Sequence, residues 1–361
     1  MKTLNSELIS ATTSMIQRVG IDTGTPASSP DAAVWTALTE AGFQSIGIPE
    51  ANGGSGGTLA DALAVVSAAS ETGALTALIE HTALAAWLAA RCGWSLDTRT
   101  MTVAIADHRC TVRAIGDRRV LDGRLDAVAH GHDADLLVVL FDSPLASERP
   151  SIAVISLTAS GITVDEGTDL VGASIDDYEF DATPIEFHAE SPIGADDLRQ
   201  RGALAYAVAL TAAARAVRDQ TLRYAGERIQ FGRHLTEFQA IQQRLASMAA
   251  LTALMESATD TAVAATSAST DPHNARRAIA AAKVVTSSSA REIAAIGHQI
   301  HGAIGFTSEH RLGRFTTSLW TWRDRYGSER YWADVLAGQI LEGGADLWDL
   351  VVGGEQAEGN H

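Results

Sequence analysis

The spacing of apolar residues divides the chain into a helical first part, a strand-rich middle part and a helical last part. Up to about residue 98 the apolar positions recur at helical spacing, and from about residue 99 they alternate with polar positions, as they do in strands. Helical spacing returns at Asp196. We therefore predict an α+β protein with three units and a flexible, polar tail. The predicted bounds are 1–98, 99–192 and 193–352 for the units and 353–361 for the tail.

Capping residues predict where helices of the first part begin and end. The tripeptide Ser-Pro-Asp at 29–31 has the order of an N-cap, a first helical residue and a first-turn acid. Thr58 with Asp61 has the spacing of a capping box, and Gly73 stands where that helix would end. Two helices with defined ends are therefore expected before residue 75.

The middle part is predicted to be an all-β unit, because β-branched residues accumulate in short alternating runs. Asp122-Gly123 lies between two such runs and has the pattern of a tight hairpin turn. The clearest strand signals lie at 101–106, 136–141, 152–157 and 178–180.

The last part is predicted to form a bundle of four long helices, with a shorter helix from about residue 328. Thr236 with Gln239 predicts a capping box at the start of one helix, and Asp271-Pro272 predicts the start of the next. The apolar run 202–214 is interpreted as a buried helix, because it is too short and too weakly apolar to span a bilayer. The long helices are expected at 196–226, 236–265, 272–301 and 309–324.

Composition and charge exclude several classes of protein. The 361 residues are 46% apolar and 20% charged, which provides enough apolar material for a buried core and argues against disorder. Lys and Arg number 27 against 44 Asp and Glu, which gives a formal net charge of −17. Such a surface repels phosphate backbones and anionic lipid headgroups, so we expect neither a nucleic acid nor a membrane as partner.

The cysteines and the first residues indicate a reducing compartment. Cys92 and Cys110 have no CxxC or metal-ligand spacing, so neither a disulfide framework nor a structural zinc site is predicted. The N-terminus places Glu7 among polar residues where a secretory signal would need an apolar run. We expect a cytoplasmic protein.

Three segments, in this order, carry a resemblance to a known family. They are GFQSIGIPE at 42–50, YAGERIQFG at 224–232 and QIHGAIGFT at 299–307. Together with the α, β, α order they resemble the acyl-CoA dehydrogenase flavoproteins over nearly the whole chain. The resemblance implies an N-terminal helical domain, a middle β-barrel or sandwich-like domain, here shortened, and a C-terminal four-helix bundle.

The resemblance implies an FAD-dependent oxidoreductase that acts on an acyl-CoA thioester. In the family a carboxylate removes the α-proton of the thioester while the β-hydride passes to the flavin, and an electron-transfer flavoprotein accepts the electrons. Two of the segments clasp the adenosine-diphosphate half of an FAD whose flavin ring is held mainly by the neighbouring subunit. The resemblance carries FAD contact onto Arg228, Gln230, Phe231, Gln299, Gly302 and Gly305.

These residue types suit a diphosphate, and they also have ordinary structural explanations. A guanidinium offers forked donors to phosphate oxygens, an aromatic ring offers an apolar face, and glycine lets the backbone approach a ligand closely. Taken alone, Arg228 would be a cation at a helix C-terminus, Phe231 a core residue and the two glycines turn residues. The shared spacing of the segments favours the cofactor.

The sequence departs from the family at both positions that hold the catalytic carboxylate. One position is a Glu directly before a Gly at the end of the helix that follows the third segment, and here Tyr326 precedes Gly327. The other lies near the start of the first bundle helix, where ungapped counting reaches Arg201-Gly202. Neither position holds an acid.

Asp324 and Glu329 are the nearest acids to the first of these positions. Either one substitutes as catalytic base only if the helix end is remodelled, because an acid at a helix terminus is more often solvated or paired with an arginine. We therefore name them as candidates and assign no catalytic residue.

The middle unit departs from the family as well. The region 96–135 lacks the family's Thr-Glu-x-x-x-Gly-Ser-Asp-like stretch and its Trp-(Ile/Val)-(Ser/Thr) segment, which hold the flavin ring and the thioester. No tryptophan occurs between Trp94 and Trp320. A chain with the diphosphate segments but without the ring-binding loop and the base resembles one subunit of the heteromeric acyl-CoA dehydrogenases of actinobacteria. In those α2β2 tetramers a second family chain supplies the base, and the substrate is a CoA thioester, for example of a steroid side chain.

Two other functions stay open at this stage. One is a self-sufficient homotetrameric dehydrogenase that uses Asp324 or Glu329, and the other is a scaffold or CoA-thioester binder without redox function. A hydrolase or metal enzyme is disfavoured, because neither HExxH nor G-x-S-x-G occurs. His298 and His301 have helical spacing but no obvious third ligand, so no metal site is predicted.

Overall fold

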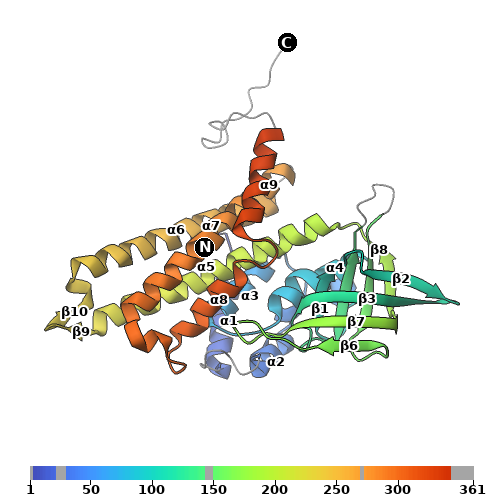
Figure 1. Ribbon diagram of the computed structural model, residues 1–361, viewed down its shortest axis with the longest axis horizontal. Coiled ribbons are helices and arrows are strands. Elements are labelled where there is room, and N and C mark those ends of the chain that lie inside the picture. The colour runs from blue at the N-terminus through green and yellow to red at the C-terminus, as the bar shows by residue number, and fades with distance from the viewer. Residues whose placement is uncertain (1–2, 22–29, 143–148, 269–271, 343–361) are drawn as a thin grey trace, which may run out of the picture.

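The computed structural model describes residues 3–21, 30–142, 149–268 and 272–342. Helices come first, strands second and helices last, which confirms the predicted α+β fold class (Figure 1). The predicted tail at 353–361 and the capping residues Ser29 and Asp271 lie outside the described residues. The main helices before the strands are α1 (Ser6–Val19), α2 (Ala32–Glu40), α3 (Leu59–Thr72), the π-helical segment η3 (Ile79–Ala85) and α4 (Ala86–Arg91).

Helix α3 has the ends that its sequence predicts. The Asp61 backbone N–H donates to the Thr58 hydroxyl over 3.3 Å, and the Thr58 N–H donates back to the Asp61 carboxylate over 2.9 Å. Gly73 follows the helix with φ of +81°, a conformation that glycine adopts without strain. The capping box and the glycine stop are therefore confirmed.

The predicted start of α2 is wrong. The helix begins at Ala32, after Pro30, and the Asp31 side chain does not cap it. Instead the Asp31 carboxylate accepts a hydrogen bond from the Leu75 N–H over 2.7 Å and pairs with Arg314 at 2.6 Å. The Asp31 carboxylate, which the local pattern assigns to the first turn of the helix, thus pairs with the buried Arg314 from the last part of the chain.

The strands form two four-stranded sheets whose inner faces share an apolar core that includes Leu121, Leu137, Tyr178 and Phe180. One sheet has the order β1-β4-β5-β8 and the other β2-β3-β7-β6, and every neighbouring pair is antiparallel except β1 with β4. The strands are β1 (Met101–Ile105), β2 (Cys110–Ile115), β3 (Arg118–Ala129), β4 (Leu136–Phe141), β5 (Ser151–Ser156), β6 (Ile162–Asp165), β7 (Ile175–Pro184) and β8 (Phe187–Glu190).

The hairpin turn predicted at Asp122-Gly123 is wrong, because β3 runs straight through these residues. The turn lies earlier, between the paired residues Ile115 and Arg118. Gly123 has φ of +113°, and a Cβ there would lie 1.8 Å from the carbonyl oxygen of Arg109, the residue before β2. The pairing of β3 with β7 shifts register at this point. The glycine therefore serves a bulge with close backbone approach, not a turn.

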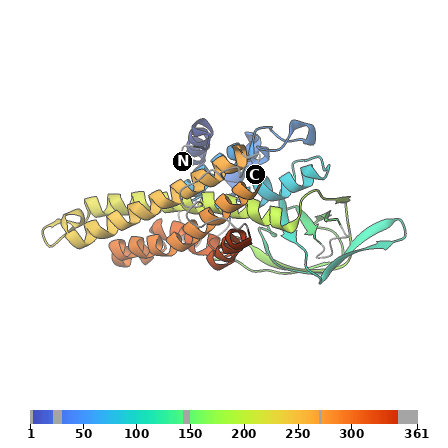
Figure 2. The same ribbon diagram turned by 90° about the horizontal axis from the view of Figure 1, so that it is seen from above.

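The last part forms the expected helical bundle, which lies at the opposite end of the molecule from the strands (Figures 1 and 2). The apolar run 202–214 is buried throughout, which confirms the interpretation as a buried helix. None of the described helices combines the length and the apolar character needed to cross a membrane. The helices are α5 (Ala195–Glu227), α6 (Gln239–Ala268), α7 (Pro272–His301), α8 (Leu312–Trp322) and α9 (Glu329–Glu342).

The capping box predicted from Thr236 and Gln239 is wrong. Helix α6 begins at Gln239, and Thr236 belongs to a short 3-10 turn before it. The reciprocal contact is made two residues earlier, where the His234 N–H donates to the Glu237 carboxylate over 3.0 Å. A capping box with the same three-residue spacing is present, but His234 and Glu237 form it around the 3-10 turn instead of at the start of α6.

His81 joins the first helices to the sheet. Its Nδ1 atom accepts a hydrogen bond from the Met101 N–H over 2.9 Å, and the ring meets Trp35 edge-on with centroids 5.3 Å apart. Burial lowers the pKa of His81 to about 4. The imidazole is therefore neutral in the folded protein at neutral pH.

This histidine makes the fold sensitive to acid. In the unfolded chain the pKa of a histidine lies near its ordinary value, so between that value and about 4 the unfolded state binds more protons and stability falls as the pH falls. We expect His81 to account for a loss of about 2 kcal/mol of unfolding free energy between about pH 7 and pH 5. Urea unfolding of wild type and His81→Gln at both pH values measures it. An equal loss in both proteins would contradict the assignment.

Candidate functional site

The Arg228 segment and the Gln299 segment lie next to each other at the end of the bundle that is far from the strands (Figure 1). The first follows α5 and the second ends α7. The Tyr224 ring stacks on the His301 ring with centroids 4.5 Å apart, and the Tyr224 hydroxyl donates to the His301 carbonyl oxygen over 3.3 Å. The fold therefore brings together the two segments that the sequence relates to one ligand.

The Arg228 segment is exposed. Arg228 is the C-cap residue of α5, and its side chain has no acid partner in the part of the chain that the structure describes. Strands β9 (Ile229–Gln230) and β10 (Arg233–His234) form a hairpin, and Phe231 between them is 92% exposed. An aromatic ring gains free energy when it leaves water, so this ring is suited to contact another molecule.

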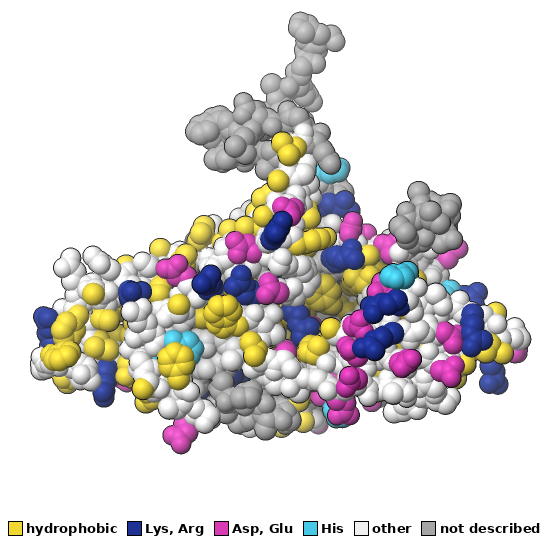
Figure 3. Space-filling model, in the orientation of Figure 1, with side chains coloured by type: hydrophobic (Ala, Val, Ile, Leu, Met, Phe, Trp, Pro, Cys, Tyr) yellow, Lys and Arg dark blue, Asp and Glu magenta, His cyan; other side chains and the backbone are white. Residues whose placement is uncertain are grey.

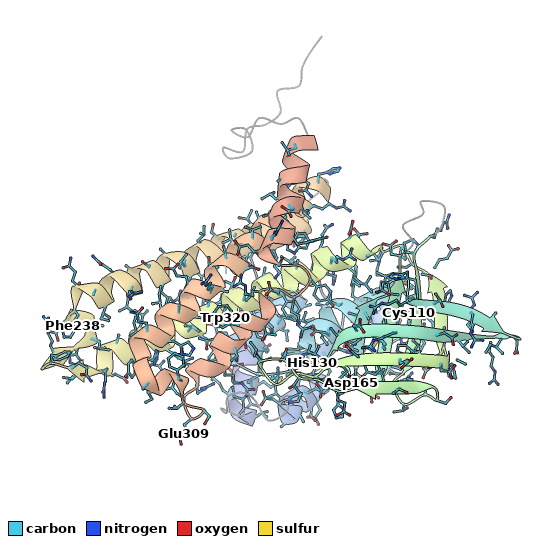
Figure 4. All side chains as sticks on the ribbon, viewed as in Figure 1. Cys110, His130, Asp165, Phe238, Glu309 and Trp320 are labelled. Atoms are coloured by element: carbon cyan, nitrogen blue, oxygen red, sulfur yellow. The ribbon has the colours of Figure 1, made fainter. Side chains whose placement is uncertain are left out.

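The Gln299 segment lines a hollow of about 670 Å³ between the end of α7 and α8. Phe306 and Trp320, which also line it, are 74% and 42% exposed. Figure 4 shows Trp320 on α8, and Figure 3 shows apolar side chains gathered on this face of the bundle. The hollow thus combines an amide side chain with apolar walls.

The two glycines of the segment have different surroundings. Gly302 has φ of +63°, and a Cβ there would meet no atom within 4 Å. Gly305 is buried, and a Cβ there would lie 2.9 Å from the His301 Cβ and 3.1 Å from a methyl group of Leu312. Space for a ligand therefore exists over Gly302, whereas Gly305 allows the turn to pack on α7 and α8.

Gly202 and Tyr326, the two positions at which the sequence analysis expects the family's base, meet in space. Gly202 lies on α5, and Tyr326 lies in the connection between α8 and α9. A Cβ on Gly202 would lie 2.3 Å from the Cγ atom of Tyr326. The Tyr326 ring stacks on the Tyr206 ring, with centroids 5.9 Å apart. Aromatic rings, not a carboxylate, thus occupy the place where these positions converge.

The connection that carries Tyr326 is fixed by hydrogen bonds. The Trp332 indole N–H donates to the Tyr326 carbonyl oxygen over 2.9 Å, and the buried Lys283 Nζ donates to the Arg323 carbonyl oxygen over 2.7 Å. Gly327 has φ of +106°, and a Cβ there would lie 2.6 Å from the Trp332 indole nitrogen. Only glycine fits at this point of the loop.

A buried carboxylate that the sequence analysis did not single out lies behind these rings. Glu80, on η3, is 1% exposed, and the Tyr206 hydroxyl donates a hydrogen bond to it. His130 Nε2 lies 3.9 Å from the other oxygen of Glu80, and His130 Nδ1 lies 3.3 Å from Asp133 (Figure 4). Burial lowers the pKa of His130, but Asp133 and Glu80 outweigh it and leave that pKa above its ordinary value. A phenol and an imidazole thus stabilise the carboxylate.

Asp324 and Glu329 do not join this cluster. Their side chains are 63% and 43% exposed and lie 4.0 Å and 3.7 Å from the Arg323 guanidinium. Acids at this exposure, near an arginine, have the arrangement of ordinary surface ion pairs.

Little room remains on the Glu80 side of the aromatic rings. The cavity beside Glu80 and Tyr206 measures about 30 Å³, which is roughly the volume of one water molecule. A larger cavity of about 350 Å³ lies between β1, β3 and Tyr326. The Arg109 and Arg325 side chains reach that second cavity, and Arg325 pairs with Asp169 at 3.1 Å.

The sequence around Glu80 contains a pattern that could have identified it as a buried, paired acid. Glu80, His81 and Thr82 interrupt an otherwise apolar stretch at 77–84, and a charged residue in such a stretch is rarely buried without a partner. Its partners Tyr206 and His130 lie far along the chain, so the sequence alone does not reveal the cluster.

Comparison with known proteins agrees with the fold. The N-terminal domain of acyl-CoA dehydrogenases matches residues 22–95, and the C-terminal domain of acyl-CoA dehydrogenases matches residues 199–348. The acyl-CoA dehydrogenase IpdE2 of Mycobacterium tuberculosis is 30% identical over 285 residues, which are 78% of this chain and 78% of IpdE2. The chain belongs to the acyl-CoA dehydrogenase family.

Two further relatives of this chain are more distant. The caffeyl-CoA reductase-Etf complex subunit CarC of Acetobacterium woodii is 24% identical over 241 residues, which are 63% of this chain and 62% of CarC. A chain of the solved ChsE4-ChsE5 complex from Mycobacterium tuberculosis superposes with a TM-score of 0.75 at 21% identity, over 96% of each chain. At that identity the likeness shows the shared fold.

FAD is the cofactor of acyl-CoA dehydrogenases, and the exposed end of the bundle fits its nucleotide half. A diphosphate needs cationic donors, and the Arg228 guanidinium has no acid partner among the described residues. An adenine ring needs an apolar face and space, which the exposed Phe231 and the hollow at Gln299 and Gly302 provide. These residues therefore suit the nucleotide half of FAD.

Proposed function

We propose that this chain is the base-deficient subunit of a heteromeric, FAD-dependent acyl-CoA dehydrogenase. In an α2β2 tetramer with a second family chain, its bundle would clasp the nucleotide half of an FAD whose flavin ring lies on the partner. The partner would supply the carboxylate that takes the α-proton of the CoA thioester. The single observation that supports this most is the convergence of Gly202 and Tyr326, neither of which is an acid, with the Tyr326 ring stacked on the Tyr206 ring.

Each clasping residue has a stated role in this proposal. Arg228 would donate to the diphosphate oxygens, Phe231 would cover an apolar face of the nucleotide, and Gln299 would hydrogen-bond the cofactor from α7. Gln230 and the open backbone at Gly302 would complete the contact, and Gly305 would hold the turn in shape. FAD when bound supplies the hydride acceptor, and the residues of this chain only bind and orient it.

The names of two relatives support the assembly. ChsE4-ChsE5 is a complex of two named chains, and CarC is a subunit of a complex that contains Etf. By analogy we propose a second acyl-CoA dehydrogenase chain as the permanent partner and an electron-transfer flavoprotein as the electron acceptor. We also propose the cytoplasm as the location, because Cys92 and Cys110 are both free thiols.

Flavin stoichiometry tests the proposal. The chain is expressed alone and together with a second family chain encoded nearby in its genome, and FAD is measured per purified assembly. We expect about one FAD per pair of unlike chains in the complex and little FAD on the chain alone, because each site needs both chains. One FAD on every chain would contradict the shared site, and no FAD in either preparation would favour a scaffold without redox function.

A second candidate is a self-sufficient homotetramer, and the buried Glu80 favours it over the acids named from the sequence. Glu80 is a carboxylate close to the converging positions, whereas Asp324 and Glu329 are exposed. If Glu80 is a base, Glu80→Gln lowers acyl-CoA turnover by the chain alone by about 10²- to 10⁴-fold, and Asp324→Asn leaves it unchanged. Dye-coupled turnover measures both, and absence of wild-type turnover contradicts this candidate.

A further inference from the structure

The arginines of the strand-rich unit differ in their partners. Five of them have a carboxylate oxygen within 3.0 Å, and on the face shown in Figure 3 basic and acidic side chains alternate over the strands. Arg118 and Arg119 have no acid partner among the residues that the structure describes. Arg118 and Arg119 are therefore the exceptions among the seven arginines of the strand-rich unit. The paired arginines are Arg99, Arg109, Arg113, Arg124 and Arg149.

The two arginines lie along a groove of about 660 Å³. One wall is the tip of the β2–β3 hairpin, which projects from the end of the molecule in Figures 1 and 2. The other wall is the link from β7 to β8, where the Ile185 N–H donates to the Arg119 carbonyl oxygen over 3.2 Å. The groove also holds apolar surface from Phe187 and from Ile115, which is 46% exposed.

A third nitrogen base faces the arginines. The Arg119 guanidinium contacts Nδ1 of His188 on β8, with no carboxylate between them. Burial and the charge of Arg119 lower the pKa of His188, so the ring is neutral and accepts this hydrogen bond. An anion placed here would find the two guanidinium groups and the Nε2–H of the neutral ring as donors. Two carboxylates also line the groove, Asp117 and Glu186, and Glu186 is paired with Arg99.

Two edge strands contribute residues to the groove, β2 through Ile115 and β8 through Phe187 and His188. Strand β2 pairs only with β3, and β8 pairs only with β5, so each has one side of its backbone without a strand partner among the described residues. Unpaired strand edges accept an extended peptide, whose backbone then continues the ladder. A small inorganic anion would use the cations alone and leave the edges and the apolar side chains without a contact.

We propose that this groove binds an extended acidic segment of a partner protein, with carboxylates on Arg118 and Arg119 and the segment's backbone along β8. The site lies on the strand-rich unit, away from Arg228 and Gln299 on the bundle, and the proposal goes beyond the dehydrogenase function. An acidic partner would bind here although the chain as a whole is strongly acidic, because the local charge decides the contact at short range.

Peptide binding to the full chain tests the proposal. The probe is a short fluorescent peptide of alternating Glu and Val, and the charge control is the same peptide with Gln in place of Glu. We expect saturable anisotropy for the Glu peptide, weaker at about 300 mM than at about 50 mM salt, and none for the Gln peptide. Amide exchange along β8 should slow when the Glu peptide is bound, which a purely ionic contact would not cause.

A matched pair of double variants separates the groove from general charge. Arg118→Glu/Arg119→Glu should weaken binding at least about tenfold. Arg199→Glu/Arg276→Glu changes the net charge equally at two ion-paired arginines of the bundle and should leave binding unchanged. Thermal unfolding confirms that all proteins are folded. Three results would overturn the proposal: no binding to wild type, equal weakening by both pairs, or binding of inorganic phosphate at the arginines without protection of β8.

Discussion

Replacing Arg228 with alanine lowers the FAD affinity of the two-chain complex by about 10²- to 10³-fold, because two forked, charge-assisted hydrogen bonds contribute about 3–4 kcal/mol together. The side chain stands at the exposed end of α5 without an acid partner among the described residues, so its removal leaves the fold intact. Flavin content after gel filtration and the dissociation constant of re-added FAD measure the effect.

Two controls accompany this variant. Arg223→Ala removes an exposed arginine five positions earlier on the same helix and should leave FAD binding unchanged. Arg228→Lys keeps the charge but not the planar fork, so we expect an intermediate loss. Full flavin occupancy in Arg228→Ala at dilute FAD would remove this residue from the proposed clasp.

Asp31→Ala destabilises the fold by about 3–5 kcal/mol, the range for breaking a buried ion pair on one side. The side chains of Arg314 and Asp31 are 5% and 6% exposed, and their nitrogen and oxygen lie 2.6 Å apart. The pair ties α2 to α8, and Arg314 Nε also donates to the Gly73 carbonyl oxygen over 2.5 Å. Without the carboxylate, the guanidinium stays buried with its charge uncompensated.

Chemical denaturation at neutral pH measures this loss. Arg199→Ala is the control, because Arg199 and Asp196 form an ion pair on the surface whose loss costs less than about 1 kcal/mol. The double variant Asp31→Leu/Arg314→Met should be more stable than Asp31→Ala alone, since neither charge then remains buried. A loss of about 1 kcal/mol or less in Asp31→Ala would show that water or other groups compensate the arginine.

Local features of the fold could be predicted because they depend on neighbouring residues. The capping box at Thr58 and the glycine stop at Gly73 involve residues three or one position from the helix end, and both are confirmed. The predictions at Asp122-Gly123 and Thr236 were wrong for a common reason. Each residue had the local pattern of a turn or a cap, but contacts with another strand or a different turn decided its conformation.

The sequence by itself determined the family, because the three motifs and their order can be read along the chain without knowledge of its fold. It also determined that neither residue 326 nor residue 202 is an acid. Only the tertiary structure decided that these two positions touch, and that Glu80 lies buried behind them with Tyr206. Motifs record short-range spacing along the chain, whereas burial and the pairing of a charge depend on which distant segments the packed core brings into contact.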